Sequence, residues 1–146
     1  MSQDVSGYGT KIRLTADKTY PAGVAITDFS DDADPITIAG LKIADSAMTL
    51  NGTLAKWQKA VPVPVTINVL PGSPNDQALT ILGNLNRIGA GKTSAGDTIT
   101  LLISYPDGQV VTLTGGILTD YDPGRSISAA GRQKTKSYSF MFENLA

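Results

Sequence analysis

Residues 131–145 read Gly-Arg-Gln-Lys-Thr-Lys-Ser-Tyr-Ser-Phe-Met-Phe-Glu-Asn-Leu, a basic lead-in followed by an aromatic strand pattern. Tyr138, Phe140 and Phe142 alternate with smaller or more flexible residues, so the three rings share one face at the two-residue period of a strand. We expect this strand to be paired inside the fold, although it lies close to the end of the chain. Taken alone, the pattern also fits an ordinary terminal strand of an antiparallel sandwich.

The same alternation runs through much of the chain upstream. The clearest case is the series of β-branched residues over 61–69, with Pro62 and Pro64 on the opposite parity. Because proline has no N–H to donate, we expect the N-terminal half of this strand to be unpaired on one edge. Further strands are expected over 10–15, over 24–26 after a turn at 21–23, over 36–43 with a bulge at Gly40, and as a hairpin over 97–105 and 109–119.

One helix is expected from Pro74 to about Ile88. Ser73 is a natural N-cap, Asp76 completes a weak capping box and Gly89 ends the helix. The expected inner stripe consists of Ala78, Leu82, Leu85 and Ile88. About seven strands and one helix predict a mainly β fold with one α-helix. We expect a small antiparallel β-barrel or sandwich with the helix packed against it, as a single domain over residues 1–146.

Composition excludes several classes of function. The 146 residues contain no cysteine and no histidine, which removes disulfides, thiolate sites, the commonest metal ligand and the usual general base near neutral pH. The net charge is −1 and only 17% of residues are charged, which argues against a sequence-reading nucleic-acid binder and against an anionic membrane surface as partner. With no signal segment and no long apolar run in sight, we expect a soluble protein made in a cytoplasm.

Three motifs have plain structural interpretations. Residues 89–93 read Gly-Ala-Gly-Lys-Thr, but a phosphate-binding loop needs a strand before it and a helix after it, and here the expected order is reversed. The acidic loop over 28–35 does not have the spacing of a calcium loop, so a solvated or interface-facing loop is favoured. Asp120 and Asp122 flank an expected turn, where solvated carboxylates are the norm.

The segment over 44–60 is long for a simple hairpin turn and contains Trp57, the chain's single tryptophan. Trp57 could plug a local core or anchor a subunit interface, and the sequence leaves both open. The polar positions of the strands carry mostly Thr and Ser rather than Lys and Glu. Such a surface suits contact with other subunits or a smooth channel lining, although a Thr-rich β protein would also show it.

The terminal pattern G-R-x-K-T-K-x-Y-x-F-x-F-E resembles the C-terminal strand of bacteriophage tail tube proteins. The size and the helix after the Val-Pro strand fit this family, in a long-tailed and contractile phage, but the N-terminal half carries no specific motif. The resemblance implies hexameric rings whose β-barrels share one inner sheet and stack into a hollow tube that conducts DNA. A related fold builds the type VI secretion tube. By the same resemblance, 44–60 is an extended hairpin or loop that reaches the neighbouring ring.

The resemblance implies a structural, non-enzymatic subunit of the virion tail, assembled in the host cytoplasm, with no cofactor and no metal. Its implied partners are further copies of itself and the tail sheath, baseplate and tape-measure proteins. DNA would pass only transiently and non-specifically through the lumen, and no membrane is involved. Two alternatives stay open: a baseplate tube-initiator or an adaptor or terminator ring of the same fold, and, less favoured, a ligand-binding β-barrel or enzyme.

Charged and aromatic residues in three segments form the candidate subunit interface. They are Asp28, Asp31, Asp32, Asp34, Lys56, Trp57, Lys59, Arg125, Arg132, Lys134 and Lys136. The acidic loop and the basic segment over 125–136 carry opposite charge in separate parts of the chain. Head-to-tail stacking lets two different surfaces meet in every contact, so we expect these segments to face each other across subunit or ring boundaries.

Overall fold

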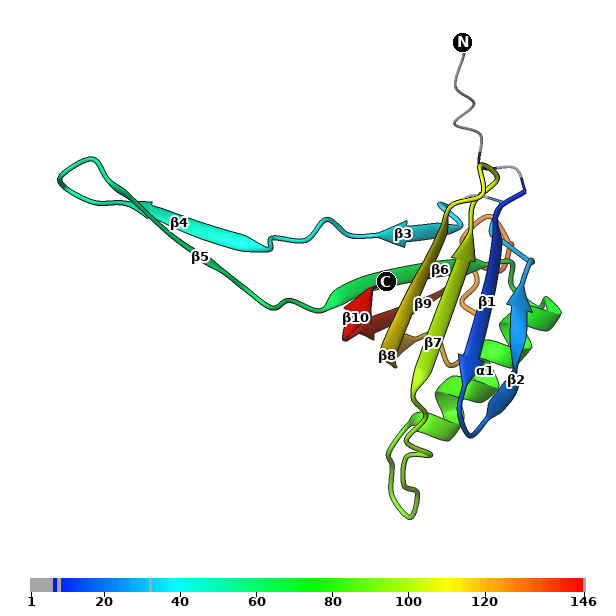
Figure 1. Cartoon of the computed structure of the whole chain (residues 1–146). Helices are drawn as coiled ribbons and strands as arrows, with labels where there is room; N and C mark the ends of the chain where they lie inside the picture. The colour runs from blue at the N-terminus through cyan, green and yellow to red at the C-terminus, as the bar shows by residue number, and fades with distance from the viewer. Residues whose placement is uncertain (1–6, 8, 32, 146) are drawn as a thin grey trace, which may run out of the picture.

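Figure 1 shows the computed structural model of the chain, which describes residues 7, 9–31 and 33–145. The described residues form ten β-strands and one α-helix rather than about seven strands and one helix. In chain order the elements are β1 (Lys11–Ala16), β2 (Tyr20–Ile26), β3 (Ile36–Ile38), β4 (Ala44–Met48), β5 (Leu54–Gln58), β6 (Val63–Val69), α1 (Pro74–Asn86), β7 (Ile99–Ser104), β8 (Val110–Tyr121), β9 (Lys136–Phe142) and β10 (Asn144–Leu145).

Eight strands form one antiparallel sheet in the order β2-β1-β7-β8-β9-β6-β3, with β10 paired to β8. The aromatic strand β9 lies between β6 and β8, so it is paired on both edges, as its sequence predicts. Its three rings, Tyr138, Phe140 and Phe142, are at most 1% exposed and belong to the main core. The predicted fold class, mainly β with one packed helix, is confirmed.

Strand β8 bends and pairs with different neighbours along its length. Its first part pairs with β7 and its second part with β9, and the break lies at Gly115 and Gly116. Gly115 has a φ of +66°, and a Cβ on Gly116 would lie 2.3 Å from the ring of Phe142. Glycine therefore lets the strand turn and approach the ring, so that both parts of the sheet cover one core.

Helix α1 packs against β2 and β8, and its start follows the sequence prediction. The Ser73 hydroxyl accepts a hydrogen bond from the Asp76 amide at 3.2 Å. The Asp76 carboxylate accepts from the Gly72 amide at 2.8 Å, whereas a capping box would use the amide of Ser73. The helix ends at Asn86, two residues earlier than predicted, because Arg87 is already extended.

The predicted inner stripe of α1 is wrong at Leu85 and Ile88, whereas Leu82 is buried and Ala78 is half-buried. The buried apolar face runs through Leu79, Leu82 and Gly83, and Leu85 and Ile88 are 43% and 74% exposed. A Cβ on Gly83 would lie 2.6 Å from the ring of Tyr121. The helix presents its glycine to this ring, and that close approach fixes its rotation.

Two of the predicted strand limits also differ from the structure. The β1–β2 turn lies at 17–19 rather than 21–23, because the carboxylate of Asp97 accepts from the amides of Lys18 and Thr19 at 3.0 Å each. Strand β3 ends at Ile38 instead of residue 43 and pairs only with 65–67 of β6. The Pro64 end of β6 thus has no strand ladder on that side in the described part of the chain, as the proline pattern predicts.

Strands β4 and β5 form a separate two-stranded sheet that projects far from the body (Figure 1). We call residues 43–59 the arm. Ile38 pairs with Val65 at its base and Ala44 pairs with Gln58 further out. Between these pairs five residues (39–43) face six (59–64), and the extra residue turns the faces of the arm relative to those of the body.

Candidate functional site: an exposed arm and a charged cluster

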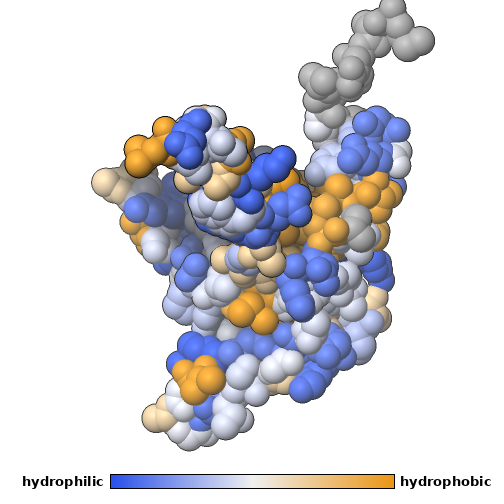
Figure 2. Space-filling view, turned by 60° about the vertical axis from the view of Figure 1, so that its left-hand side comes forward, coloured by the Kyte–Doolittle hydropathy of each residue, from blue (hydrophilic) through white to orange (hydrophobic). Residues whose placement is uncertain are grey.

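The two faces of the arm differ in character. Cross-strand pairing places Met48 opposite Leu54 and Ser46 opposite Lys56 on one face. Met48 and Leu54 are 66% and 52% exposed, and Leu50, in the turn between the strands, is completely exposed. Figure 2 brings this side forward and shows hydrophobic atoms at the surface among hydrophilic ones. The first face therefore combines two aliphatic side chains with one cation.

Trp57 lies on the other face of the arm, opposite Asp45 and next to the pair formed by Ala47 and Ala55. It is 48% exposed, so it does not plug a core of its own subunit, and this alternative is excluded. An isolated two-stranded hairpin is at best marginally stable in water. An arm with an exposed tryptophan and exposed aliphatic side chains is typical of a surface that another molecule covers.

Ion pairs at the base of the arm lie within one chain. The carboxylate of Asp45 is 3.1 Å from the ammonium of Lys59 and 3.4 Å from that of Lys42. The Ser46 amide and these ammonium groups hold the pKa of Asp45 below its ordinary value. The charge of Lys59, a predicted interface residue, is therefore already paired within the arm, whereas Lys56 makes no ion pair with any described residue.

The acidic loop and the basic segment meet inside one subunit. Arg132 donates to the carboxylate of Asp31 at 2.5 Å, so this pair forms within one subunit. That the two segments also face each other across subunit boundaries stays a prediction. Asp28 accepts from the Asn75 amide at the start of α1 at 3.3 Å, and the Asp34 carbonyl accepts from the Asn68 side chain at 2.7 Å. Asp32 lies outside the described residues. Lys134 is exposed, and its amide donates to the Ser126 carbonyl.

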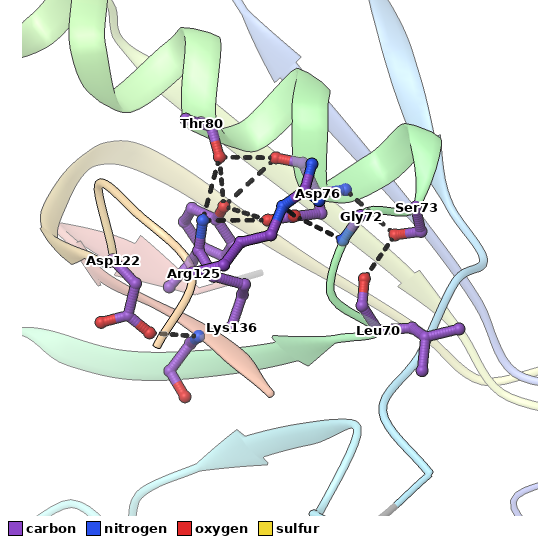
Figure 3. Close-up of polar contacts among 10 residues, drawn as sticks. Leu70, Gly72, Ser73, Asp76, Thr80, Asp122, Arg125 and Lys136 are labelled. Atoms are coloured by element: carbon purple, nitrogen blue, oxygen red, sulfur yellow. Dashed lines mark hydrogen bonds and ion pairs between the residues drawn. The ribbon is translucent and has the colours of Figure 1, made fainter. Parts of the chain in front are cut away.

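Lys136 is buried, so its prediction as an interface cation is wrong. Its side chain is 3% exposed, and its ammonium lies 3.3 Å from the carboxylate of Asp76, which is itself 3% exposed. Arg125 approaches the same carboxylate at 4.0 Å (Figure 3). The Tyr138 hydroxyl donates to it at 2.7 Å. Lys136 follows the parity of the buried rings and lies inside for that reason.

Burial and bonding have opposite effects on the ionisation of this cluster. Burial disfavours the charged carboxylate of Asp76, but the Gly72 amide, the Tyr138 hydroxyl and the Lys136 ammonium outweigh it and lower the pKa of Asp76. Burial raises the pKa of the Tyr138 hydroxyl, and the Asp76 carboxylate that accepts from it acts in the same direction. The cluster therefore joins α1 and β9 through charged groups, and no buried side-chain nitrogen or oxygen among the described residues lacks a hydrogen-bond partner.

A groove opens where the arm joins the body. Residues 60–62, 115, 117 and 141–143 line it, and its volume is about 410 Å³. The lining is mainly apolar, and Ile117 is 57% exposed there. We call this the base groove.

The described residues bear on metal binding, phosphate binding and membrane insertion. Among them no group of three or more acidic, histidine or cysteine side chains could hold a metal ion. Residues 89–93 follow a helix, and Gly89 and Lys92 exchange backbone hydrogen bonds at 3.1 and 3.0 Å, so they form a tight turn instead of a phosphate loop. No helix in the described part of the chain is long and apolar enough to cross a membrane.

The predictions made from the sequence above include neither the buried ion pair of Lys136 and Asp76 nor the base groove. The strand parity of 136–142 contains the signal for Lys136, because it shares the face of Tyr138, Phe140 and Phe142. No local pattern signals the base groove, because it brings together the arm base, the bend of β8 and the end of β9.

Comparison with solved structures shows a shared fold at low identity. The chain is similar to the sheath/tube terminator of an extracellular contractile injection system (TM-score 0.57, 13% identity, 100% of this chain and 97% of that chain). It is also similar to the tube-terminating cap of the anti-feeding prophage (0.55, 11%, 100% and 91%) and to a chain of the anti-feeding prophage baseplate (0.55, 8%, 100% and 96%). The resemblance to tail tube proteins agrees with this fold.

No curated protein matches the sequence. A family model described as tail fiber protein gp32 matches it over residues 3–146. Because this model spans nearly the whole chain, the protein belongs to the tail fiber protein gp32 family.

Proposed function

We propose that the chain is a structural subunit that assembles into hexameric rings on the axis of a phage tail, and that these rings stack into the hollow inner tube through which DNA passes. The single observation that carries this proposal is the arm. Its exposed side chains, Trp57, Met48, Leu50 and Leu54, lie on a hairpin that projects away from the body. Burying one such side chain contributes about 1.5–3 kcal/mol, so covering several in each contact would drive assembly.

A second candidate is a discrete ring that begins or ends the tube. The observation that favours it is the identity of the similar structures, which are a sheath/tube terminator, a tube-terminating cap and a baseplate chain. Such a subunit would stop after one ring because only one of its faces accepts a further ring. The baseplate structure is six-fold symmetrised, which supports the same ring number for either role.

Both roles imply the same surroundings. The partners would be further copies of this chain and the tail sheath, baseplate and tape-measure proteins, within the virion tail after assembly in the host cytoplasm. DNA would make only transient, non-specific contact with the lumen. We propose no catalytic role, because the charged groups inside the fold serve packing and the similar structures are parts of tubes, caps and baseplates.

The test is electron microscopy combined with sedimentation velocity over a range of protein concentrations. Long hollow tubes would support the tube role, and six-fold rings of uniform height would support the terminator or baseplate role. A monomer that persists at high concentration and moderate salt would overturn both.

A further inference from the structure

The base groove is an apolar surface that its own subunit leaves open. Val61 and Pro62 form one side at the root of the arm, and Ile117 and Met141 contribute from β8 and β9. Glu143 also lines the groove, and its carboxylate makes no ion pair with any described residue. An occupant must therefore bring aliphatic side chains and a cation.

One face of the arm has this composition. Met48 and Leu54 lie opposite each other, and Lys56 is the next residue of β5 on the same face. Lys56 is exposed and, within the described part of the chain, has no acidic partner. The arm thus carries the aliphatic pair and the unpaired cation that the groove lacks.

The arm does not fill the groove of its own subunit in this structure. Ala60 lines the groove, and the preceding strand β5 (Leu54–Gln58) lies on the arm. Figure 1 shows β5 projecting away from the body. Leu54 is six residues from Ala60 along the chain, which places it about 20 Å away at the rise of a strand. The paired hairpin extends away from the body, which leaves the groove open to another molecule (Figure 1).

We propose that the base groove receives the arm of a second copy of this chain, with Met48 and Leu54 in the groove and Lys56 beside Glu143. This inference rests on the proposed function, since it identifies the receiving surface for the arm in a repeating assembly. A projecting surface that fits a different surface on the next copy gives a head-to-tail contact that propagates. The charge pair sets the register, and the aliphatic pair supplies most of the affinity.

Disulfide trapping tests this contact directly, because the natural sequence contains no cysteine. One preparation carries Leu54→Cys and the other Ile117→Cys, and the two are mixed, allowed to assemble and oxidised. A mixed disulfide can form only between two molecules, and only if the two Cα atoms come within about 7 Å. Ile88→Cys, an exposed isoleucine near the end of α1, replaces Ile117→Cys in the matched control.

The expected result is a mixed dimer of Leu54→Cys with Ile117→Cys in at least tenfold excess over the dimer with Ile88→Cys. Equal yields from the two mixtures would overturn the proposal. Exclusive intrachain cross-linking in a Leu54→Cys/Ile117→Cys double variant would also overturn it, since the arm would then fill its own groove.

A charge exchange provides a second measurement that does not depend on trapping. Lys56→Glu and Glu143→Lys should each raise the concentration needed for assembly about threefold to tenfold, and the double variant should return it towards the wild-type value. Failure of the double variant to recover would contradict the pairing of these residues. If the wild-type protein assembles and the single variants assemble at the same concentration, this contact is wrong but the ring proposal stands. If the wild-type protein never assembles, both proposals are wrong.

Discussion

The ammonium of Lys136 lies 3.3 Å from the carboxylate of Asp76, and both side chains are only 3% exposed. Lys136 is the first residue of β9 and Asp76 lies in the first turn of α1, so the pair joins the helix to the aromatic strand. The Gly72 amide donates to the same carboxylate (Figure 3). The Tyr138 hydroxyl donates to it as well. This arrangement holds two elements together that are about sixty residues apart in the sequence.

We expect Lys136→Met to destabilise the subunit by about 3–5 kcal/mol, because it removes the buried counter-ion of Asp76 and leaves only the more distant Arg125, at 4.0 Å. Urea unfolding monitored by circular dichroism measures the loss. The double variant Asp76→Asn/Lys136→Met removes both charges and should lose less than the sum of the two single variants. Wild-type stability of Lys136→Met would show that the pair does not hold the helix to the sheet.

Acid should destabilise the protein through Asp76 and Asp97, whose pKa values both lie below the ordinary 3.8 in the folded state. Burial opposes ionisation of Asp97, but the Thr19 hydroxyl, the Asn86 amide and the Thr19 and Lys18 backbone amides outweigh it. A carboxyl with a lowered folded pKa contributes stability that is complete above its unfolded pKa and is lost as the pH falls through its folded pKa.

Between pH 7 and pH 5 these two carboxyl groups should therefore not change the melting temperature. At pH values below about 4 they become protonated, and the melting temperature should decrease. Thermal melts of wild type and Asp97→Asn across this range make the comparison. Asp97→Asn should melt lower at pH 7 and show a shallower fall in acid. Parallel curves for the two proteins would exclude Asp97 as a source of the acid sensitivity.

Gly116→Ala should destabilise the fold by about 1–3 kcal/mol, since the new methyl group would overlap the ring of Phe142. Gly124→Ala is the matched control, because no atom lies within 4 Å of a Cβ at that position and φ is not in the left-handed region. Thermal melts of the two variants decide the matter. If they melt together, β8 can shift away from the ring at little cost.

The sequence predicts those elements whose determinants are local. The alternation in 136–142 and 61–69 defines β9 and β6, and the Ser73–Asp76 pattern defines the start of α1. The rotation of the helix depends on Gly83 meeting Tyr121, a contact between distant segments that no helical period can reveal. The parity of 136–142 does place Lys136 inside, but its charge favoured a surface interpretation.

The candidate site was harder to predict because it depends on which segments become neighbours. Phe29 forms a bridge to Val69, and Val69 pairs with Lys136 across the sheet. This chain of contacts brings the loop after β2 beside the start of β9, so Asp31 reaches Arg132 in the same subunit. Asp31 and Arg132, which are separate in the sequence, therefore meet within one molecule.

Trp57→Ala should weaken assembly without weakening the subunit. The side chain is 48% exposed on the arm and makes no part of the core, so the unfolding free energy should stay within about 0.5 kcal/mol of wild type. A tryptophan anchor in an interface typically costs about 2 kcal/mol or more when truncated, which corresponds to roughly thirtyfold in the concentration needed for assembly. Trp57→Phe keeps an aromatic ring at this position, so it should assemble at a concentration between those of wild type and Trp57→Ala.

Sedimentation velocity over a concentration series, with thermal melts as the control for folding, separates assembly from stability. If Trp57→Ala assembles at the wild-type concentration, this face of the arm is solvent-exposed in the assembly, and the opposite face with Met48 and Leu54 has to account for it alone.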